Sequence, residues 1–345
     1  MPRLRRVSPT SPGLHRVRRG RGFSYVDAGG NPVTDQATLA RIEALVLPPA
    51  WTDVWVCPVA SGHIQAVGTD AAGRRQYRYH DHWRLTRDLA KHERVLDFGA
   101  LLPAVRRQVC VDLQRKGLDR ERVLSCAVRM LYLGFLRIGS EQYASQNQTF
   151  GLATMRKDHV SVSQGVVTFD YIAKSGKQRV QSLVEPEVGA VVQALKRRRG
   201  GGEELLAYRD GDRWVDVKSA DINGHLRALT GGEFTAKDFR TWSATVLAAV
   251  GLAVSHDAGS VTARKRAVSR VVQEVAHYLG NTPAVCRSSY IDPRVIDLYD
   301  SGITIEKDLK LLGDGASYGQ PATQGRIEAA LLRLLRTADA QALAG

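Results

Sequence analysis

The sequence lacks any apolar run that approaches the roughly 18 residues of a membrane-spanning helix, so no membrane span is predicted. It also lacks a Cys-x-x-Cys pair. The four cysteines are widely separated, at Cys57, Cys110, Cys126 and Cys286. This spacing argues against disulfides and against a cysteine-based zinc site, so we expect reduced thiols in the cytoplasm. The only close histidine pair, His80-x-His82, has no further ligands beside it, and we predict no metal site.

Acidic residues are absent from the first 21 positions, which hold seven arginines. This segment has no apolar stretch, so we expect no secretory signal. We interpret residues 1–21 as a basic, flexible arm that either contacts nucleic acid or is simply solvated. Over the whole chain, 49 Lys and Arg outnumber 35 Asp and Glu, for a formal net charge of +14. This excess favours a polyanionic partner, with nucleic acid as the first choice.

The 345 residues are enough for two domains, and the patterning predicts an α+β chain with a boundary between 85 and 92. Residues 22–88 are predicted to form a small β-rich N-terminal domain with a helix at 35–45, a hairpin around Gly62 and a strand at 74–80. Residues 89–345 are predicted to form a larger, mainly α domain. Its expected helices include one that Asp119 caps and that stops near Gly139, followed by 187–199, 219–229, 237–250, 261–278 and 325–338.

Inside the second domain, the apolar period changes to two between His159 and Val184. This change predicts a three-stranded antiparallel sheet with turns at Gln164-Gly165 and Ser175-Gly176. Lys174 would lie at the tip of the second hairpin. Taken alone, Lys174 is an exposed hairpin lysine, Arg137 a helix-end arginine and Arg240 a solvated arginine in a first helical turn.

Cleavage of a phosphodiester by a protein nucleophile would give such residues a purpose. The transition state places negative charge on two non-bridging oxygens, which guanidinium groups can hold without a metal. The leaving sugar oxygen needs a general acid. Tyr290, in the phrase Arg287-Ser-Ser-Tyr-Ile291, is a candidate nucleophile near the end of a basic chain.

The order Arg137, Lys174, Arg240, Asn281, Tyr290 resembles the type IB DNA topoisomerases, specifically their compact bacterial and poxvirus-like group. The resemblance covers roughly residues 22–310. The phrases that carry it are Leu47-Pro-Pro-Ala-Trp51, Gly62-His-Ile-Gln65, Arg75-Gln-Tyr-Arg-Tyr-His80, Arg137-Ile-Gly-Ser-Glu-x-Tyr143, Asn147-x-Thr-Phe-Gly151, Ala173-Lys-Ser-Gly176, Lys237-Asp-Phe-Arg-Thr-Trp242, Leu279-Gly-Asn281 and Ser289-Tyr290.

The resemblance implies a nicking and rejoining enzyme that relaxes supercoiled DNA. Tyr290 would form a 3′-phosphotyrosyl link, Arg137 and Arg240 would hold the non-bridging oxygens, and Lys174 would protonate the leaving 5′ oxygen. Asn281 stands where many relatives carry histidine, and its amide can still donate a hydrogen bond. The family needs neither ATP nor a divalent metal, so we expect no cofactor. We also expect a monomer without an obligate protein partner, associated with the nucleoid and closing as a clamp around duplex DNA.

Four further residues match the family's DNA-contacting positions. Gln76, Tyr77 and Tyr79 match its major-groove strand, and Lys237 is a candidate phosphate contact. An ordinary strand with aromatic packing is the alternative for the first three. A tyrosine recombinase is the nearest rival reading, but it expects His-x-x-Arg in place of Lys237-Asp-Phe-Arg240 and a helical front domain. A non-catalytic DNA-binding protein would explain the charge but not the ordered phrases.

Overall fold

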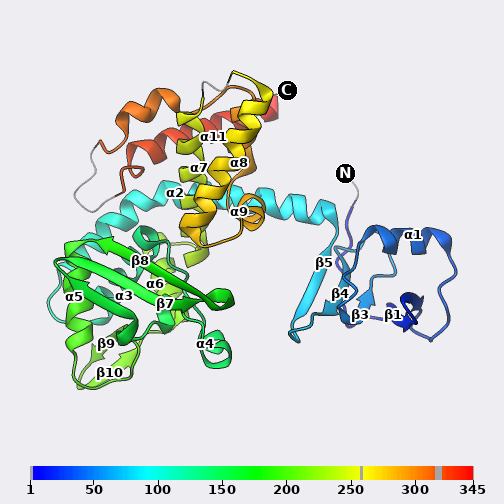
Figure 1. Cartoon of the computed structure of the whole chain (residues 1–345), viewed down its shortest axis with the longest axis horizontal. Coiled ribbons are helices and arrows are strands. Elements are labelled where there is room, and N and C mark those ends of the chain that lie inside the picture. The colour runs from blue at the N-terminus through cyan, green and yellow to red at the C-terminus, as the bar shows by residue number, and fades with distance from the viewer. Residues whose placement is uncertain (1–2, 257–258, 315–320, 345) are drawn as a thin grey trace. The chain divides into compact units, whose positions relative to one another are not determined.

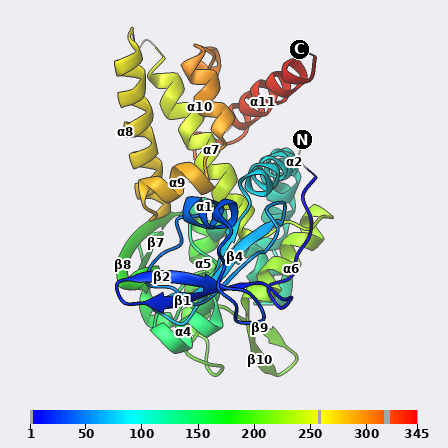
Figure 2. The ribbon, with the colours of Figure 1, turned by 90° about the vertical axis from the view of Figure 1, so that its right-hand side faces the viewer.

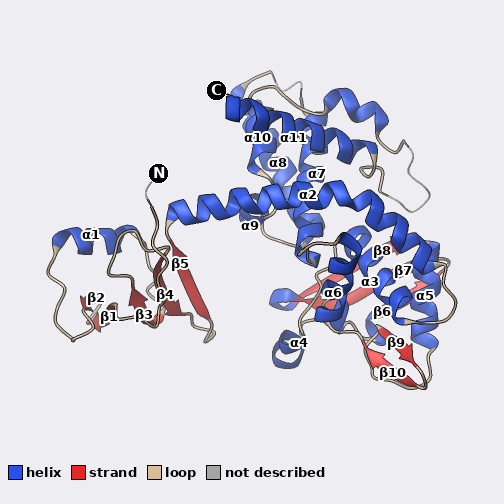
Figure 3. Cartoon of the chain, turned by 180° about the vertical axis from the view of Figure 1, so that it is seen from behind, coloured by secondary structure: helices blue, strands red, loops and turns tan. Residues whose placement is uncertain are grey.

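The computed structural model describes residues 3–256, 259–314 and 321–344 of the chain. The chain divides into two compact units, an N-terminal unit of Met1–Glu93 and a C-terminal unit of Arg94–Gly345. The first is rich in strands and the second is larger and mainly helical, as Figure 3 shows by colour. The predicted α+β class is thereby confirmed. Among the described residues, no helix is long and apolar enough to cross a membrane.

The N-terminal unit is built on a five-stranded antiparallel sheet in the order β2-β1-β3-β4-β5, with β5 at one edge (Figure 1). Asp35 begins the helix of this unit by accepting a 2.8 Å hydrogen bond from the amide of Thr38. The elements are β1 (Leu14–Arg19), β2 (Gly22–Val26), α1 (Gln36–Ala44), β3 (Thr52–Val56), β4 (Ile64–Thr69) and β5 (Arg75–Tyr79).

Strand β1 lies inside the segment that we expected to be a flexible arm. It pairs with β2 from His15 to Arg19 and with β3 at Leu14 and His15. Its Arg16 guanidinium lies 4.2 Å from the ring centre of Phe23 and donates to the carbonyls of Pro48 and Trp51. Because arginine stems pack on aromatic rings while their charges bind carbonyl groups, a run rich in arginine is compatible with a strand. The expectation of an arm is therefore wrong for residues 14–19.

The C-terminal unit combines helices with two small sheets. The long helix α2 begins in the N-terminal unit and continues into this one. The helices are α2 (Asp81–Leu113), α3 (Arg120–Gly134), α4 (Glu141–Asn147), α5 (Pro186–Arg197), α6 (Ser219–Thr230), α7 (Ala236–Val254), α8 (Val261–Leu279), α9 (Pro283–Ser289), α10 (Pro293–Asp300) and α11 (Arg326–Ala344). Short 3-10 turns are η1 (Leu152–Thr154), η2 (Lys157–His159), η3 (Lys174–Gly176) and η4 (Glu306–Leu311). The strands are β6 (Val160–Ser163), β7 (Val166–Ala173), β8 (Lys177–Val184), β9 (Ala207–Asp210) and β10 (Arg213–Asp216).

The predicted three-stranded antiparallel sheet is present, with β7 between β6 and β8. Both predicted turns have two consecutive residues with positive φ: Gln164 and Gly165 at 49° and 78°, and Ser175 and Gly176 at 69° each. Two positive φ angles characterise the turn that matches the twist of a hairpin. The second turn places Lys174 at the hairpin tip.

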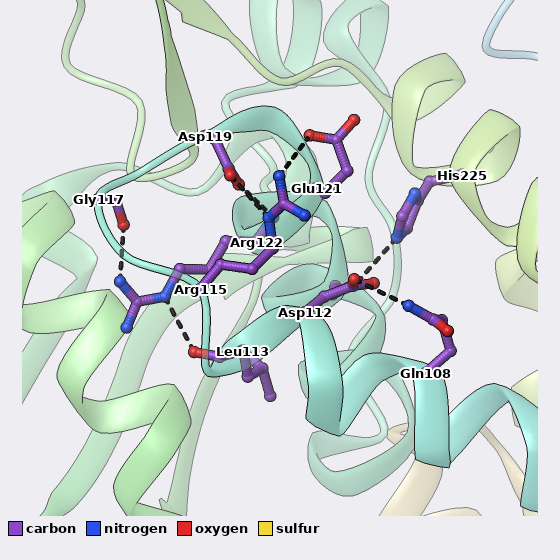
Figure 4. A network of polar contacts seen from close by, with 10 residues as sticks. Gln108, Asp112, Leu113, Arg115, Gly117, Asp119, Glu121, Arg122 and His225 are labelled. Atoms are coloured by element: carbon purple, nitrogen blue, oxygen red, sulfur yellow. Dashed lines mark hydrogen bonds and ion pairs between the residues drawn. The ribbon is translucent and has the colours of Figure 1, made fainter.

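A buried polar network joins α2, α3 and α6, and Figure 4 shows part of it. Ser125 of α3 donates to Asp112 of α2 at 2.7 Å, and its oxygen lies 2.9 Å from Nε2 of His225 on α6. Because the serine has only one hydroxyl proton, Nε2 of His225 must carry the proton of the second bond. Gln108 donates to the other oxygen of Asp112. These bonds tie together the helices behind the sheet.

Helix α8 lies beside α7 and α9 in the C-terminal unit (Figure 2). Helices α9 and α10 and the hairpin β9–β10 were not predicted, because each is short. Helix α3 ends at Gly134 rather than near Gly139. Its cap, Phe135, takes a left-handed φ of 48°, and the chain beyond it is extended and carries Arg137.

Candidate active site

The C-terminus of α8 is the element around which the predicted catalytic residues gather. Gly280 caps the helix with a φ of 61°, and its amide donates to the carbonyl of His277. The amide of Asn281 donates to Ala276 at 2.9 Å. This left-handed cap ends α8 and turns the chain at Asn281. Thr282 then caps α9, and Pro283 is its first residue.

Three arginines from three separate segments donate to three successive carbonyls at this helix end. Arg179 comes from β8, Arg240 from α7 and Arg137 from the chain after α3. Helix C-termini leave their last carbonyls unpaired and carry the negative end of the helix dipole, so they attract cations. The pairs are Arg179 Nη2 with Tyr278 O at 2.7 Å, Arg240 Nη2 with Leu279 O at 2.7 Å and Arg137 Nη2 with Gly280 O at 2.8 Å.

Arg240 is the most buried of the three, with 5% of its surface exposed. Its second Nη donates to the carbonyl of Phe135 at 2.6 Å, and its guanidinium lies 5.4 Å from the ring centre of Tyr290. Burial, together with the nearby charge of Arg137, lowers the pKa of Arg240 to about 10. The side chain therefore stays charged at neutral pH and holds its charge close to the phenol.

Arg137 is half-buried and also donates to Oδ1 of Asn281. The amide nitrogen Nδ2 of Asn281 is buried and has no hydrogen-bond partner in the described structure, and the same holds for Nε of Arg240. Buried donors without partners cost free energy, so such groups are found where a ligand supplies the acceptor. Two such donors, one on the amide of Asn281 and one on the guanidinium of Arg240, together with the guanidinium of Arg137, suit an oxygen-rich anion.

The backbone at Tyr290 is held from both sides. Its amide, at the end of α9, donates to Cys286 O at 3.0 Å. Its carbonyl accepts from Oγ1 of Thr245 at 3.3 Å, and the same hydroxyl accepts from the amide of Asp292 at 3.2 Å. Thr245 is a fully buried residue of α7, the helix that also carries Arg240. One helix thus positions both the phenol and the guanidinium beside it.

Lys174 is exposed at the tip of the β7–β8 hairpin and makes no recorded contact with the other four candidates. It lines a groove of about 630 Å³ together with Arg137, Arg179 and Asn281. The structure therefore gathers Arg137, Arg240, Asn281 and Tyr290 around the α8 terminus and places Lys174 on a groove that two of them share.

The cluster is an uncompensated positive site. Within residues 3–256, 259–314 and 321–344, no carboxylate forms an ion pair with Arg137, Lys174, Arg179 or Arg240. By contrast, the buried Arg129 has a carboxylate partner in Glu185. Because buried charges are normally paired, a site of this kind is prepared for an anionic ligand.

The remaining predicted residues lie elsewhere. In the N-terminal unit, Gln76 donates to Asp70 at 2.9 Å, and the rings of Tyr77 and Tyr79 are stacked with centres 6.0 Å apart. Tyr77 is exposed on the edge strand β5. Lys237 is exposed in the first turn of α7, in the C-terminal unit.

The described residues contain no group of three or more His, Cys, Asp or Glu that could hold a metal ion. The pair His80-x-His82 forms a local contact, in which Nδ1 of His80 accepts from the amide of His82 at 3.1 Å. Sequence reasoning missed Arg179 and Thr245. For Arg179 the available signal was its register, since it faces Tyr171 across the hairpin on the buried side of the sheet. Nothing in the sequence distinguished Thr245.

Comparison with known proteins gives a consistent result along the chain. Residues 80–310 match the family described as eukaryotic DNA topoisomerase I, catalytic core, and residues 22–70 match the bacterial DNA topoisomerase IB N-terminal domain. DNA topoisomerase 1B of Acanthamoeba polyphaga mimivirus is 30% identical over 299 residues, which cover 84% of this chain and 88% of the viral one. DNA topoisomerase 1B of vaccinia virus (strain Copenhagen) is 22% identical over 280 residues, covering 78% of this chain and 84% of the viral one. The chain belongs to the type IB DNA topoisomerases.

Proposed function

We propose that this protein relaxes supercoiled duplex DNA by nicking and rejoining one strand through Tyr290. The observation that supports this best is the gathering of Arg137, Arg240 and Asn281 at the end of α8, with the Arg240 guanidinium beside the Tyr290 ring and two buried donors left without acceptors. A scissile phosphate offers non-bridging oxygens to both donors. It also supplies the negative charge that the cluster lacks.

In the proposed reaction, the phenolic oxygen of Tyr290 forms a bond to phosphorus while the bond from phosphorus to the 5′ oxygen breaks. The phenol gives up its proton to solvent water, and the nearby charge of Arg240 stabilises the phenolic oxygen as it attacks. Arg137, Arg240 and Asn281 hold the non-bridging oxygens, whose negative charge grows in the transition state. Lys174 gives a proton to the departing 5′ oxygen. The reverse sequence rejoins the strand, because the phosphotyrosyl ester conserves the bond energy.

We further propose that Gln76, Tyr77 and Tyr79 contact the major groove and that Lys237 contacts a phosphate. Asp70 holds the amide of Gln76 in a fixed orientation, which supports a role in reading a base edge. The proposal includes a monomeric protein whose two units close on duplex DNA as a clamp. Sedimentation of the free protein and of its DNA complex tests the monomer.

The nucleophile is tested by incubating the protein with supercoiled plasmid, and with a nicked suicide substrate, in EDTA and without ATP. We expect relaxation and a covalent protein–DNA adduct from the wild type and neither from Tyr290→Phe, because only the hydroxyl oxygen is lost. Tyr278→Phe is a matched control with an exposed phenol on α8. Relaxation by Tyr290→Phe would overturn the assignment, and strand exchange between two sites would indicate a recombinase.

The general acid is tested with Lys174→Ala on two substrates that differ in one atom. With the natural 5′ oxygen, we expect single-turnover cleavage to slow by about 10²- to 10⁴-fold, which is the usual contribution of general acid catalysis. With a 5′ sulfur leaving group, which needs no protonation, we expect the rate to approach that of the wild type. Equal slowing on both substrates would remove Lys174 from this role.

A further inference from the structure

Arg179 connects the hairpin that carries Lys174 to the helix end that carries Asn281. Its Nη2 donates to the carbonyl of Tyr278 on α8 at 2.7 Å, and its Nε donates to Gln181 on its own strand at 3.1 Å. It pairs with Tyr171 across the β7–β8 hairpin, close to the tip. The guanidinium is therefore fixed by two hydrogen bonds, one to α8 and one to its own strand β8.

The contact is unusually close, because Gly280 has no side chain. A Cβ atom at Gly280 would lie 2.0 Å from Nη1 of Arg179, far inside any allowed contact. Glycine at this position thus serves two purposes: it takes the left-handed cap conformation, and it leaves room for the guanidinium. Burial lowers the pKa of Arg179, and the neighbouring charge of Arg137 lowers it further. Two like charges are held together here by the carbonyls of α8.

Lys174 is exposed, so its position relative to Asn281 depends on the strands that carry it. Both residues line the same groove, and Arg179 lines it as well. The hydrogen bond from Arg179 to Tyr278 joins the two walls of this groove, one on β8 and one on α8. This bond therefore fixes β8 relative to the end of α8.

We infer that Arg179 is a positioning residue, which holds the β7–β8 hairpin against the end of α8 so that Lys174 reaches the leaving 5′ oxygen, and that Gly280 is required to admit it. This inference rests on the function proposed above. It assigns to Arg179 an effect that acts through Lys174, whereas Arg137 and Arg240 act on the phosphate. Loss of Arg179 should therefore resemble loss of the general acid.

Arg179→Ala is tested on the oxygen and sulfur substrates in single-turnover cleavage. We expect about ten- to hundredfold slower cleavage with the 5′ oxygen, the effect of losing a charge-assisted hydrogen bond, and a rate near that of the wild type with the 5′ sulfur. The ratio of the two rates serves as an internal control, because a folding defect would lower both equally. Wild-type rates on both substrates, or equal slowing on both, would overturn the inference.

Gly280→Ala supplies a second test with a matched control at Gly231. Both glycines are left-handed helix caps, with φ of 61° and 65°, but a Cβ at Gly231 meets no atom within 4 Å. Both variants carry the same backbone strain, while only Gly280→Ala displaces Arg179. We expect Gly280→Ala to cleave the 5′ oxygen substrate more slowly than the wild type and the 5′ sulfur substrate at a rate near that of the wild type. Gly231→Ala should cleave both substrates like the wild type. Equal rates for the two variants would contradict the inference. Absence of an adduct from the wild type would instead overturn the proposed function.

Discussion

The oxygen and the nitrogen of the Asn281 side-chain amide have different surroundings. Its Oδ1 accepts from Arg137, while its buried Nδ2 has no partner in the described structure. A histidine at this position could donate a hydrogen bond and carry a positive charge. Asparagine keeps only the donor, and its oxygen restrains the guanidinium next to it. We therefore propose that the residue acts on the phosphate directly and through Arg137.

We predict that Asn281→Ala slows single-turnover cleavage by about ten- to hundredfold, the range found when one donor to a developing oxyanion is lost. Asn281→Asp should be slower still. It keeps the acceptor for Arg137, but it lacks the donor and places a negative charge beside the phosphate. Rapid-quench cleavage of a suicide substrate measures both rates. An Asp variant as fast as the Ala variant would contradict direct contact with the phosphate.

At the scale of elements, α2, α3 and α6 are joined by a titratable network. His225 is 8% exposed and shares Ser125 with Asp112. Burial lowers the pKa of His225, although the charge of Asp112 opposes this effect. In the unfolded chain the histidine titrates near its ordinary value of about 6.5. Below that pH, the unfolded state binds a proton that the folded state resists.

It follows that His225 contributes stability above about pH 6.5 and that this contribution is lost as the pH falls toward the lowered pKa of the folded state. We predict that the melting temperature falls between pH 7.5 and pH 5.5 and that His225→Gln reduces this fall. The variant itself should lose about 1–3 kcal/mol at pH 7.5, because the network loses a bond. His15→Gln, at an exposed site, serves as the control. An unchanged pH dependence in His225→Gln would refute the assignment.

At the scale of the whole molecule, the net charge of +14 makes binding to any nucleic acid depend on salt. Each phosphate contact releases counterions, so the logarithm of the affinity falls linearly with the logarithm of the salt concentration. Charge alone attracts many partners. The cluster at α8 then distinguishes an enzyme from a protein that only binds.

We predict that Lys237→Ala weakens duplex binding about equally for different sequences and lowers the salt slope by about one unit, as expected for one lost phosphate contact. Lys307, an exposed lysine of η4 to which we assign no contact, is the matched control. Fluorescence anisotropy measures binding without cleavage when both lysine variants also carry Tyr290→Phe. An unchanged slope for Lys237→Ala would remove this residue from the interface.

Local chemistry explains how much of the fold could be predicted. Asp119 and Asp35 cap helices through bonds that span three residues, and the turn at Ser175-Gly176 needs only its own residues to adopt positive φ. Strand β1 was missed because its Arg16 is stabilised by Phe23 and by the carbonyls of Pro48 and Trp51. A pattern of charge cannot reveal such partners.

The sequence by itself determined most of the elements, the basic charge and the ordered residues from Arg137 to Tyr290, because caps, turns and motifs depend on near neighbours. Only the tertiary structure decided that Arg137, Arg179 and Arg240 meet on successive carbonyls of α8. Arg137 and Gly280 are 143 positions apart, and Arg179 and Tyr278 are 99 apart. The carbonyls of a helix end carry no sequence signal, since every residue has one. Their role appears only when the fold brings three cations to them.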